Sequence, residues 1–114
     1  ELKWLKNLED LQLHDNKLVA LPEFIGELNK LESLDIHNNS LTSLPASMAL
    51  LIKLNFLNAG NNKLNILSED LCSLTELNLI NLECNDLDAS SADVASCFHS
   101  LLGSQLNHDN CGGE

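Results

Sequence analysis

A strict internal repeat is the feature of this sequence that most constrains its fold. The second copy, residues 31–53, reads LESLDIHNNSLTSLPASMALLIK, and its neighbours follow the same pattern without insertion. A unit of this length cannot bury its own apolar side chains, so successive units must stack and bury them against each other. The sequence therefore predicts an elongated solenoid, formed as a single domain over 1–114. Its full repeats are 8–30, 31–53, 54–76 and 77–100.

Alternation of apolar and polar residues near the start of each unit predicts a short β-strand with one buried side. Stacking the units would align these strands in one parallel sheet. The polar or variable residues would then face outward along the sheet. The expected inward residues are Leu8, Leu11, Leu13, Leu31, Leu34, Ile36, Leu54, Leu57, Ala59, Leu77, Ile80 and Leu82.

The ninth position of every unit is asparagine, and the return segment of each unit is apolar. A side-chain amide both donates and accepts hydrogen bonds, so a stacked column of amides can satisfy backbone groups at the turn after each strand. Pro22 and Pro45 then precede short apolar segments, which we expect to form short helices or 3₁₀ turns. The asparagine column is Asn16, Asn39, Asn62 and Asn85.

The pattern LxxLxLxxNxL resembles the leucine-rich repeat family, and the resemblance covers nearly the whole chain. The first three copies are similar to the 23-residue LPxxI subtype (Ras-group-like) of many intracellular signalling scaffolds, although Ser68 and Ser91 replace the proline later. The resemblance implies an α/β fold: a curved solenoid with a parallel sheet on the concave side and short helices or 3₁₀ turns on the convex side. It also implies an internal asparagine ladder.

The two ends of the chain depart from the regular repeat. Residues 1–7 match the tail of a preceding unit, and 101–114 match a degenerate fifth unit. Helical spacing of apolar residues over 90–102 predicts an α-helix there, as if the array drifts toward a longer helical repeat. We therefore expect a fragment of a longer array, whose uncapped ends allow docking in a larger assembly.

The charge balance narrows the partner class. The 17 acidic and 6 basic residues give a net charge of -11, which disfavours nucleic acid and anionic membrane surfaces. Spanning a bilayer takes an apolar run of about 18 residues or more, and the sequence contains none, so we expect no membrane insertion. A protein partner remains, and its binding surface on such a solenoid is commonly the concave one.

The four cysteines do not form a recognisable metal-binding or extracellular capping pattern. Cys97 occupies a position that is leucine in earlier units, so we predict a small core hydrophobe there. Reduced thiols and a cytoplasmic location are the favoured interpretation. The match of Asn38-Asn39-Ser40 to the glycosylation sequon is interpreted as chance, unless the protein is secreted.

Two clusters distinguish the predicted concave surface. Phe56 and Leu79 would lie side by side as an exposed apolar contact, unless a flanking segment covers them. His14 and His37, with Asp15 and Asp35 nearby, could share a proton, a metal or an anion, but a polar contact to a protein partner is favoured. The predicted partner-binding residues are Asp10, Gln12, His14, Asp35, His37, Phe56, Asn58, Leu79, Asn81 and Glu83.

The sequence offers no catalytic constellation. Cys84 would meet His37 only across two strand spacings, and no glycine-rich phosphate loop is present. We therefore predict a non-enzymatic protein-interaction module in signalling or assembly, with no cofactor and no metal. Two alternatives stay open: a ligand-binding ectodomain of a secreted or surface receptor, and a purely structural subunit of a large complex.

Overall fold

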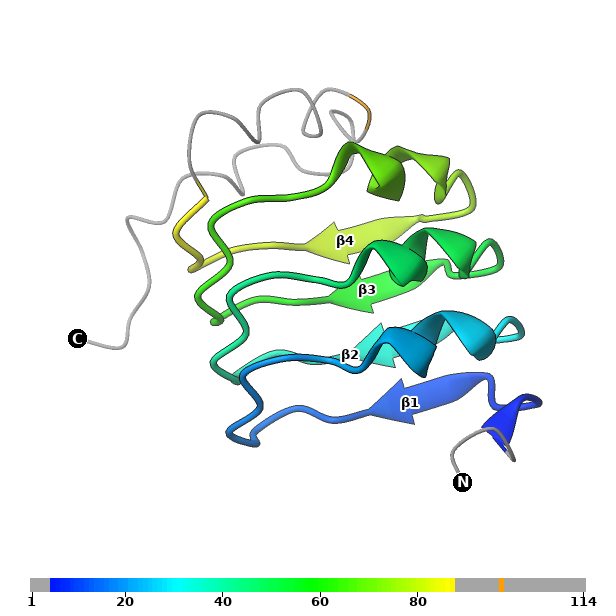
Figure 1. The fold of residues 1–114 in the computed structure, drawn as a ribbon, viewed down its shortest axis with the longest axis horizontal. Helices are drawn as coiled ribbons and strands as arrows, with labels where there is room; N and C mark the ends of the chain where they lie inside the picture. Colours follow the sequence, from blue (N-terminus) through cyan, green and yellow to red (C-terminus); the bar gives the residue numbers. More distant parts are fainter. Residues whose placement is uncertain (1–4, 88–96, 98–114) are drawn as a thin grey trace.

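The computed structural model describes residues 5–87 and residue 97. Within them the chain forms four short strands and three 3₁₀ helices in regular alternation (Figure 1). The strands are β1 (Asp10–Gln12), β2 (Ser33–Asp35), β3 (Phe56–Asn58) and β4 (Leu79–Asn81). The 3₁₀ helices are η2 (Glu23–Glu27), η3 (Ala46–Leu50) and η4 (Glu69–Ser73).

The four strands make one parallel sheet in the order β1-β2-β3-β4. Asp10 pairs with Ser33, Ser33 with Phe56, and Phe56 with Leu79, so each step across the sheet leads to the equivalent residue of the next repeat. The repeat period and the predicted solenoid are thereby confirmed. The finer assignment to the 23-residue LPxxI subtype stays a prediction.

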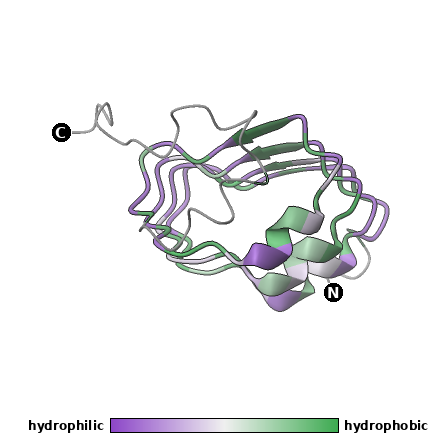
Figure 2. Ribbon diagram, turned by 90° about the horizontal axis from the view of Figure 1, so that it is seen from above, coloured by the Kyte–Doolittle hydropathy of each residue, from purple (hydrophilic) through white to green (hydrophobic). Residues whose placement is uncertain are grey.

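Strands and 3₁₀ helices occupy opposite sides of each coil, as the view along the stack shows (Figure 2). The apolar interior between them contains the inward residues predicted from the alternation. Residues such as Leu34, Ile36 and Leu57 are completely inaccessible to solvent. Burying one such side chain stabilises the fold by about 1.5–3 kcal/mol. Leu11 and Leu13 are only partly buried, because they belong to the first coil of the described stack.

The three 3₁₀ helices begin directly after the position that proline holds in the first two coils. Pro22 and Pro45 have φ values of -70° and -65° and an extended ψ, and each directs the chain into the five-residue 3₁₀ helix that follows it. Ser68 replaces proline before η4, where its hydroxyl accepts a hydrogen bond from the Asp70 N–H at 3.1 Å. This side-chain cap compensates for the missing proline.

Asparagine side chains join successive coils through hydrogen bonds to the backbone. The Asn62 amide nitrogen donates to Ile36 O of the preceding coil and to Ala59 O of its own coil, at 3.0 and 3.1 Å. The Asn62 carbonyl oxygen accepts from the Leu41 N–H of the preceding coil at 3.0 Å. Asn39 and Asn85 repeat this arrangement one coil before and one coil after. The predicted asparagine ladder is thereby confirmed.

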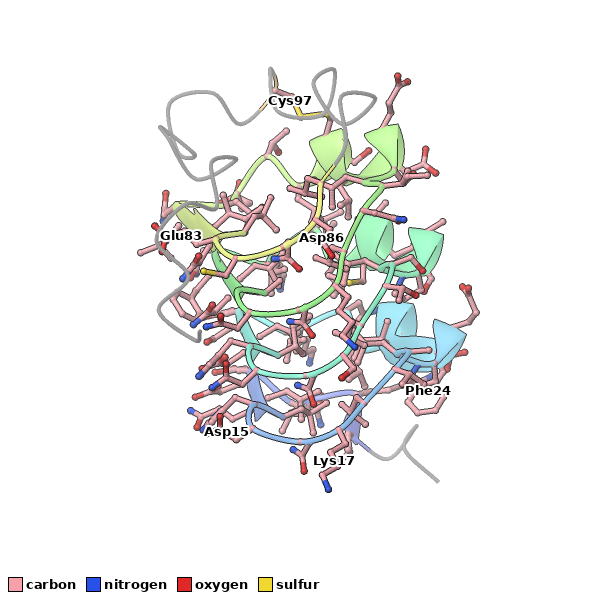
Figure 3. The ribbon with its side chains drawn as sticks, turned by 90° about the vertical axis from the view of Figure 1, so that its left-hand side faces the viewer. Asp15, Lys17, Phe24, Glu83, Asp86 and Cys97 are labelled. Atoms are coloured by element: carbon pink, nitrogen blue, oxygen red, sulfur yellow. A yellow bond between two sulfur atoms is a disulfide. The ribbon has the colours of Figure 1, made fainter. Side chains whose placement is uncertain are left out.

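The prediction of reduced cysteines is wrong, and so is the prediction of Cys97 as a core residue. Cys72, in η4, forms a disulfide with Cys97, which is exposed (Figure 3). Their separation of 25 residues is one coil plus two residues, so stacking brings their Cα atoms to 5.8 Å, within the range of a disulfide. Cys84 is disulfide-bonded as well.

Several predictions fall on residues beyond the described part of the chain. They are the preceding-unit tail at 1–4, the α-helix over 90–102 apart from Cys97, and the degenerate fifth unit at 101–114. Among the described residues, no helix has the length and apolar character needed to cross a membrane.

The ladder makes a testable prediction about stability. Asn62→Ala should lower the free energy of unfolding by about 2–4 kcal/mol, because it leaves the buried Leu41 N–H without its partner and removes one of two side-chain hydrogen bonds to each of Ile36 O and Ala59 O. Asn16→Ala is the matched control. Asn16 is exposed and bonds only to carbonyls of its own coil, so its loss should cost under about 1 kcal/mol. Urea titration measures both, and equal losses would contradict a role in joining coils.

Candidate functional site

The candidate site is the surface of the sheet that faces away from the core, here called the outer sheet face. The middle residue of each strand points inward, so the flanking residues point outward. Figure 3 shows Asp15 and Glu83 on this side of the stack and Phe24 near the 3₁₀ helices on the other. The face carries the ten predicted residues: Asp10, Gln12, His14, Asp35, His37, Phe56, Asn58, Leu79, Asn81 and Glu83.

Phe56 and Leu79 are register partners on β3 and β4. Leu79 leaves 49% of its surface accessible, and Phe56 is half-buried. Their side-by-side arrangement agrees with the prediction, and within the described residues no other segment covers Leu79. Their use in binding stays a prediction.

The fifth residue of each repeat forms a column on this face, and three of its members have a structural role that the sequence analysis missed. The column is Gln12, Asp35, Asn58 and Asn81. Asn58 Oδ1 accepts a hydrogen bond from the Gly60 N–H at 3.2 Å, and Asn81 Oδ1 accepts from the Glu83 N–H at 2.9 Å. Asp35 does the same for the His37 N–H at 3.2 Å. Each side chain thus folds back on the backbone two residues later, which is the local bond that short Asn and Asp side chains favour. The only sequence signal was the Asp/Asn identity of that column.

The turn that follows each strand forces one residue into the left-handed region. Asp15, Asn38, Asn61 and Cys84 have φ values of 60°, 58°, 53° and 63°. Asn and Asp tolerate this conformation better than other non-glycine residues, which accounts for three of the four. The Asn38 amide nitrogen donates to Asp15 Oδ1 of the preceding coil at 2.7 Å, so these two residues form part of a polar edge beside the outer sheet face.

Two histidines and an aspartate converge at the β1–β2 end of the face. The rings of His14 and His37 stack with their centroids 4.9 Å apart and their planes 4° from parallel. Asp35 Oδ1 lies 2.5 Å from His37 Nδ1, and Asp35 Oδ2 lies 3.6 Å from His14 Nδ1. The amide nitrogen of Asn58 lies 3.4 Å from His37 Nδ1. Asp15, predicted to be near this group, bonds to Asn38 instead.

A second apolar surface lies at the β1 end of the core. A hollow of about 170 Å³ opens there among Leu5, Leu11, Leu13 and Leu18, all of which are half-buried. It marks where the apolar interior of the first described coil is least covered. The predicted use of an uncapped end for assembly stays a prediction.

Comparison with known proteins agrees with this geometry. A family described as a leucine-rich repeat region matches residues 1–100. The structure of a leucine-rich repeat protein from Leptospira interrogans is similar, with a TM-score of 0.77 and 32% sequence identity. The match covers 82% of this chain and 24% of that protein, so the chain spans about a quarter of its length. No match was found among curated proteins.

The fold-back bonds predict which face residues matter for stability. Asn81→Ala should lower the free energy of unfolding by about 0.5–1.5 kcal/mol, because it removes the partner of the Glu83 N–H. Gln12→Ala, in the same column of β1, removes only a 3.4 Å contact between exposed side chains and should change stability by less than about 0.5 kcal/mol. Thermal or urea unfolding of both variants measures the difference. If Asn81→Ala left the free energy of unfolding unchanged, the fold-back hydrogen bond would have no role in stability.

Proposed function

The chain belongs to the leucine-rich repeat family, and on this premise we propose that it is a non-catalytic module that binds a polypeptide on its outer sheet face. Repeat solenoids of this kind commonly act through such a face. The observation that carries the proposal is the Phe56–Leu79 pair. Two apolar side chains paired on neighbouring strands of an otherwise polar face, with Leu79 half-exposed, support a contact of the hot-spot kind there.

Polar groups surround this pair and would define its specificity. Asn58 and Asn81 lie on the same strands, two residues further along, and Glu83 follows β4. Both asparagine Oδ1 atoms already accept backbone hydrogen bonds, and the Asn58 amide nitrogen lies 3.4 Å from His37 Nδ1, so the Asn81 amide nitrogen is the group that a ligand would meet. The partner that fits is a polypeptide with an apolar side chain for the pair and acceptor groups beside it. The net charge of -11 favours a neutral or basic partner.

A ligand-binding ectodomain of a secreted or surface protein is the second candidate, and one observation favours it. The Cys72–Cys97 disulfide persists in an oxidising compartment, whereas cytosolic reductants keep most thiols reduced. The cytoplasmic location and the signalling role expected from the sequence stay predictions. In either setting the proposed binding face is the same.

The apolar pair gives the first functional prediction. The double variant Phe56→Ala/Leu79→Ala should weaken partner binding by about 10-fold or more, because truncating hot-spot residues typically costs over 1 kcal/mol each. Affinity capture identifies the partner first, and calorimetry with the purified partner then measures both dissociation constants.

The matched control truncates two exposed apolar residues away from the sheet. Leu50 at the end of η3 and Ile52 after it are 61% and 60% exposed, so Leu50→Ala/Ile52→Ala should leave affinity unchanged. Equal affinity of the Phe56/Leu79 variant and the unaltered chain would remove the pair from the binding surface.

The second candidate function makes its own prediction. Protein isolated from its natural source, with free thiols blocked at lysis, should yield a peptide pair linked through Cys72 and Cys97 if the chain works in an oxidising compartment. Mass mapping without reductant detects the pair, and a glycan on the exposed Asn38 would agree with it. Blocked thiols at both cysteines would instead favour the reducing interior of a cell.

A further inference from the structure

Three metal-ligand side chains meet at the β1–β2 end of the outer sheet face. One donor atom from each of His14, Asp35 and His37 can be chosen so that all three lie within 4.8 Å of one another. The two histidines occupy equivalent positions in adjacent coils, so stacking of the coils alone brings them together. Asp35, the last residue of β2, directs one carboxylate oxygen toward each ring.

His14 Nδ1 is an unsatisfied polar atom within this cluster. It is shut off from solvent and has no hydrogen-bond partner in the described structure. Its closest charged neighbour is Asp35 Oδ2 at 3.6 Å, which is beyond hydrogen-bond distance. A buried nitrogen without a partner is costly, and a bound cation between the nitrogen and the carboxylate would remove that cost.

The geometry points to a binding site for one divalent transition-metal ion of the Zn²⁺ class, held by His14, Asp35 and His37. Imidazole nitrogen and carboxylate oxygen are ligands that suit zinc, whereas Ca²⁺ and Mg²⁺ prefer oxygen ligands alone. The inference requires no polypeptide partner and therefore stands apart from the proposed function.

The three donors reach one ion only after side-chain rotation, because the two imidazole rings are nearly parallel and each nitrogen lone pair lies in the plane of its own ring. Zinc-ligand bonds of about 2.0–2.1 Å place neighbouring donors of a tetrahedral site roughly 3.3 Å apart. The 3.6 Å between His14 Nδ1 and Asp35 Oδ2 is already near that value. The 2.5 Å contact of Asp35 Oδ1 with His37 Nδ1 must lengthen, because the metal ion would replace the hydrogen bond between these two atoms.

The cluster is open to solvent on one side and bordered by the next coil on the other. The side chains of His14, His37 and Asp35 are 35%, 26% and 19% exposed, so the cluster is accessible from the outer sheet face. The next coil carries Gly60 in place of a third ring, and Asn58 borders the cluster there with its amide nitrogen 3.4 Å from His37 Nδ1. Three protein ligands leave one position of a tetrahedral site open for water or for a group of a bound molecule.

Calorimetric titration of the chelator-treated chain with ZnCl₂, without reductant, tests the inference. One Zn²⁺ should bind per chain, and excess Mg²⁺ should not displace it. His14→Ala and His37→Ala should each weaken binding by about 10-fold or more, and Asp35→Asn should do so as well. Intact disulfides keep thiolates from competing, since Cys72, Cys84 and Cys97 are all disulfide-bonded.

The control removes the other two imidazoles of the sequence. His99→Ala/His108→Ala should bind Zn²⁺ with the affinity of the unaltered chain. Far-UV circular dichroism checks that each variant keeps its fold, which the partial exposure of His14 and His37 favours. Absorption of the Co²⁺-loaded chain should show tetrahedral bands that disappear in His14→Ala/His37→Ala. Absence of Zn²⁺ binding, or binding that survives this double variant, would overturn the inference.

Discussion

Every other feature of this structure depends on the hydrogen bonds that asparagine side chains make across the coil boundaries. At the turn after each strand the backbone leaves the sheet inside an apolar stack, where unpaired N–H and C=O groups are costly. Asn39, Asn62 and Asn85 are the buried polar residues of the described chain, and each satisfies groups of two coils at once. An apolar residue of similar size would fill the space but leave a backbone N–H of the preceding coil unpaired and remove hydrogen bonds to carbonyls of both coils. The constant spacing from strand to asparagine follows from this requirement, because an insertion between them would move the amide away from the coil it must reach.

A constant period has a consequence for the outer sheet face. Equivalent residues of successive repeats become neighbours about 4.8 Å apart, whatever their chemistry. Core positions are held to leucine-like residues by packing, while the outward positions vary from coil to coil. This is why the same column holds Asp10 on β1 and Leu79 on β4, or His14 in one coil and Gly60 two coils later. The side chain found at a given place on this face therefore depends on which coil supplies it, and not on the local secondary structure, which is the same in every coil.

Much of this arrangement could be predicted from the sequence, because periodicity determines both register and burial. The inward residues Leu34 and Leu57, the asparagine ladder and the adjacency of Phe56 and Leu79 all follow from counting in whole repeats. The Cys72–Cys97 disulfide could not be predicted in this way, because the two cysteines are one period plus two residues apart. Counting in whole repeats aligned Cys97 with core leucines instead. Stacking tolerates such an offset on the helical side, where side chains of adjacent coils reach each other at several positions.

Other parts of the site depend on side-chain rotamers, which a repeat pattern does not specify. The fold-back of Asn58 and Asn81 onto the backbone takes part of two predicted binding residues out of the free surface. Likewise the sequence put Asp15 and Asp35 equally near the histidines, and only Asp35 points at both rings, since Asp15 is held by Asn38. The period predicts which residues are neighbours, but local hydrogen bonds decide which of their atoms remain available.

The two distinctive clusters lie at opposite ends of one continuous face. His14, Asp35 and His37 occupy the β1–β2 end, and Phe56 with Leu79 occupies the β3–β4 end. Since β1 and β4 are three strand spacings apart, the part of the face that the structure describes spans roughly 14 Å across the strands, about the reach of four or five residues of extended polypeptide. His14 and His37 follow Asp10 and Ser33, the register partners of the apolar pair, by four residues, so a ligand that contacts both clusters must cross the face diagonally.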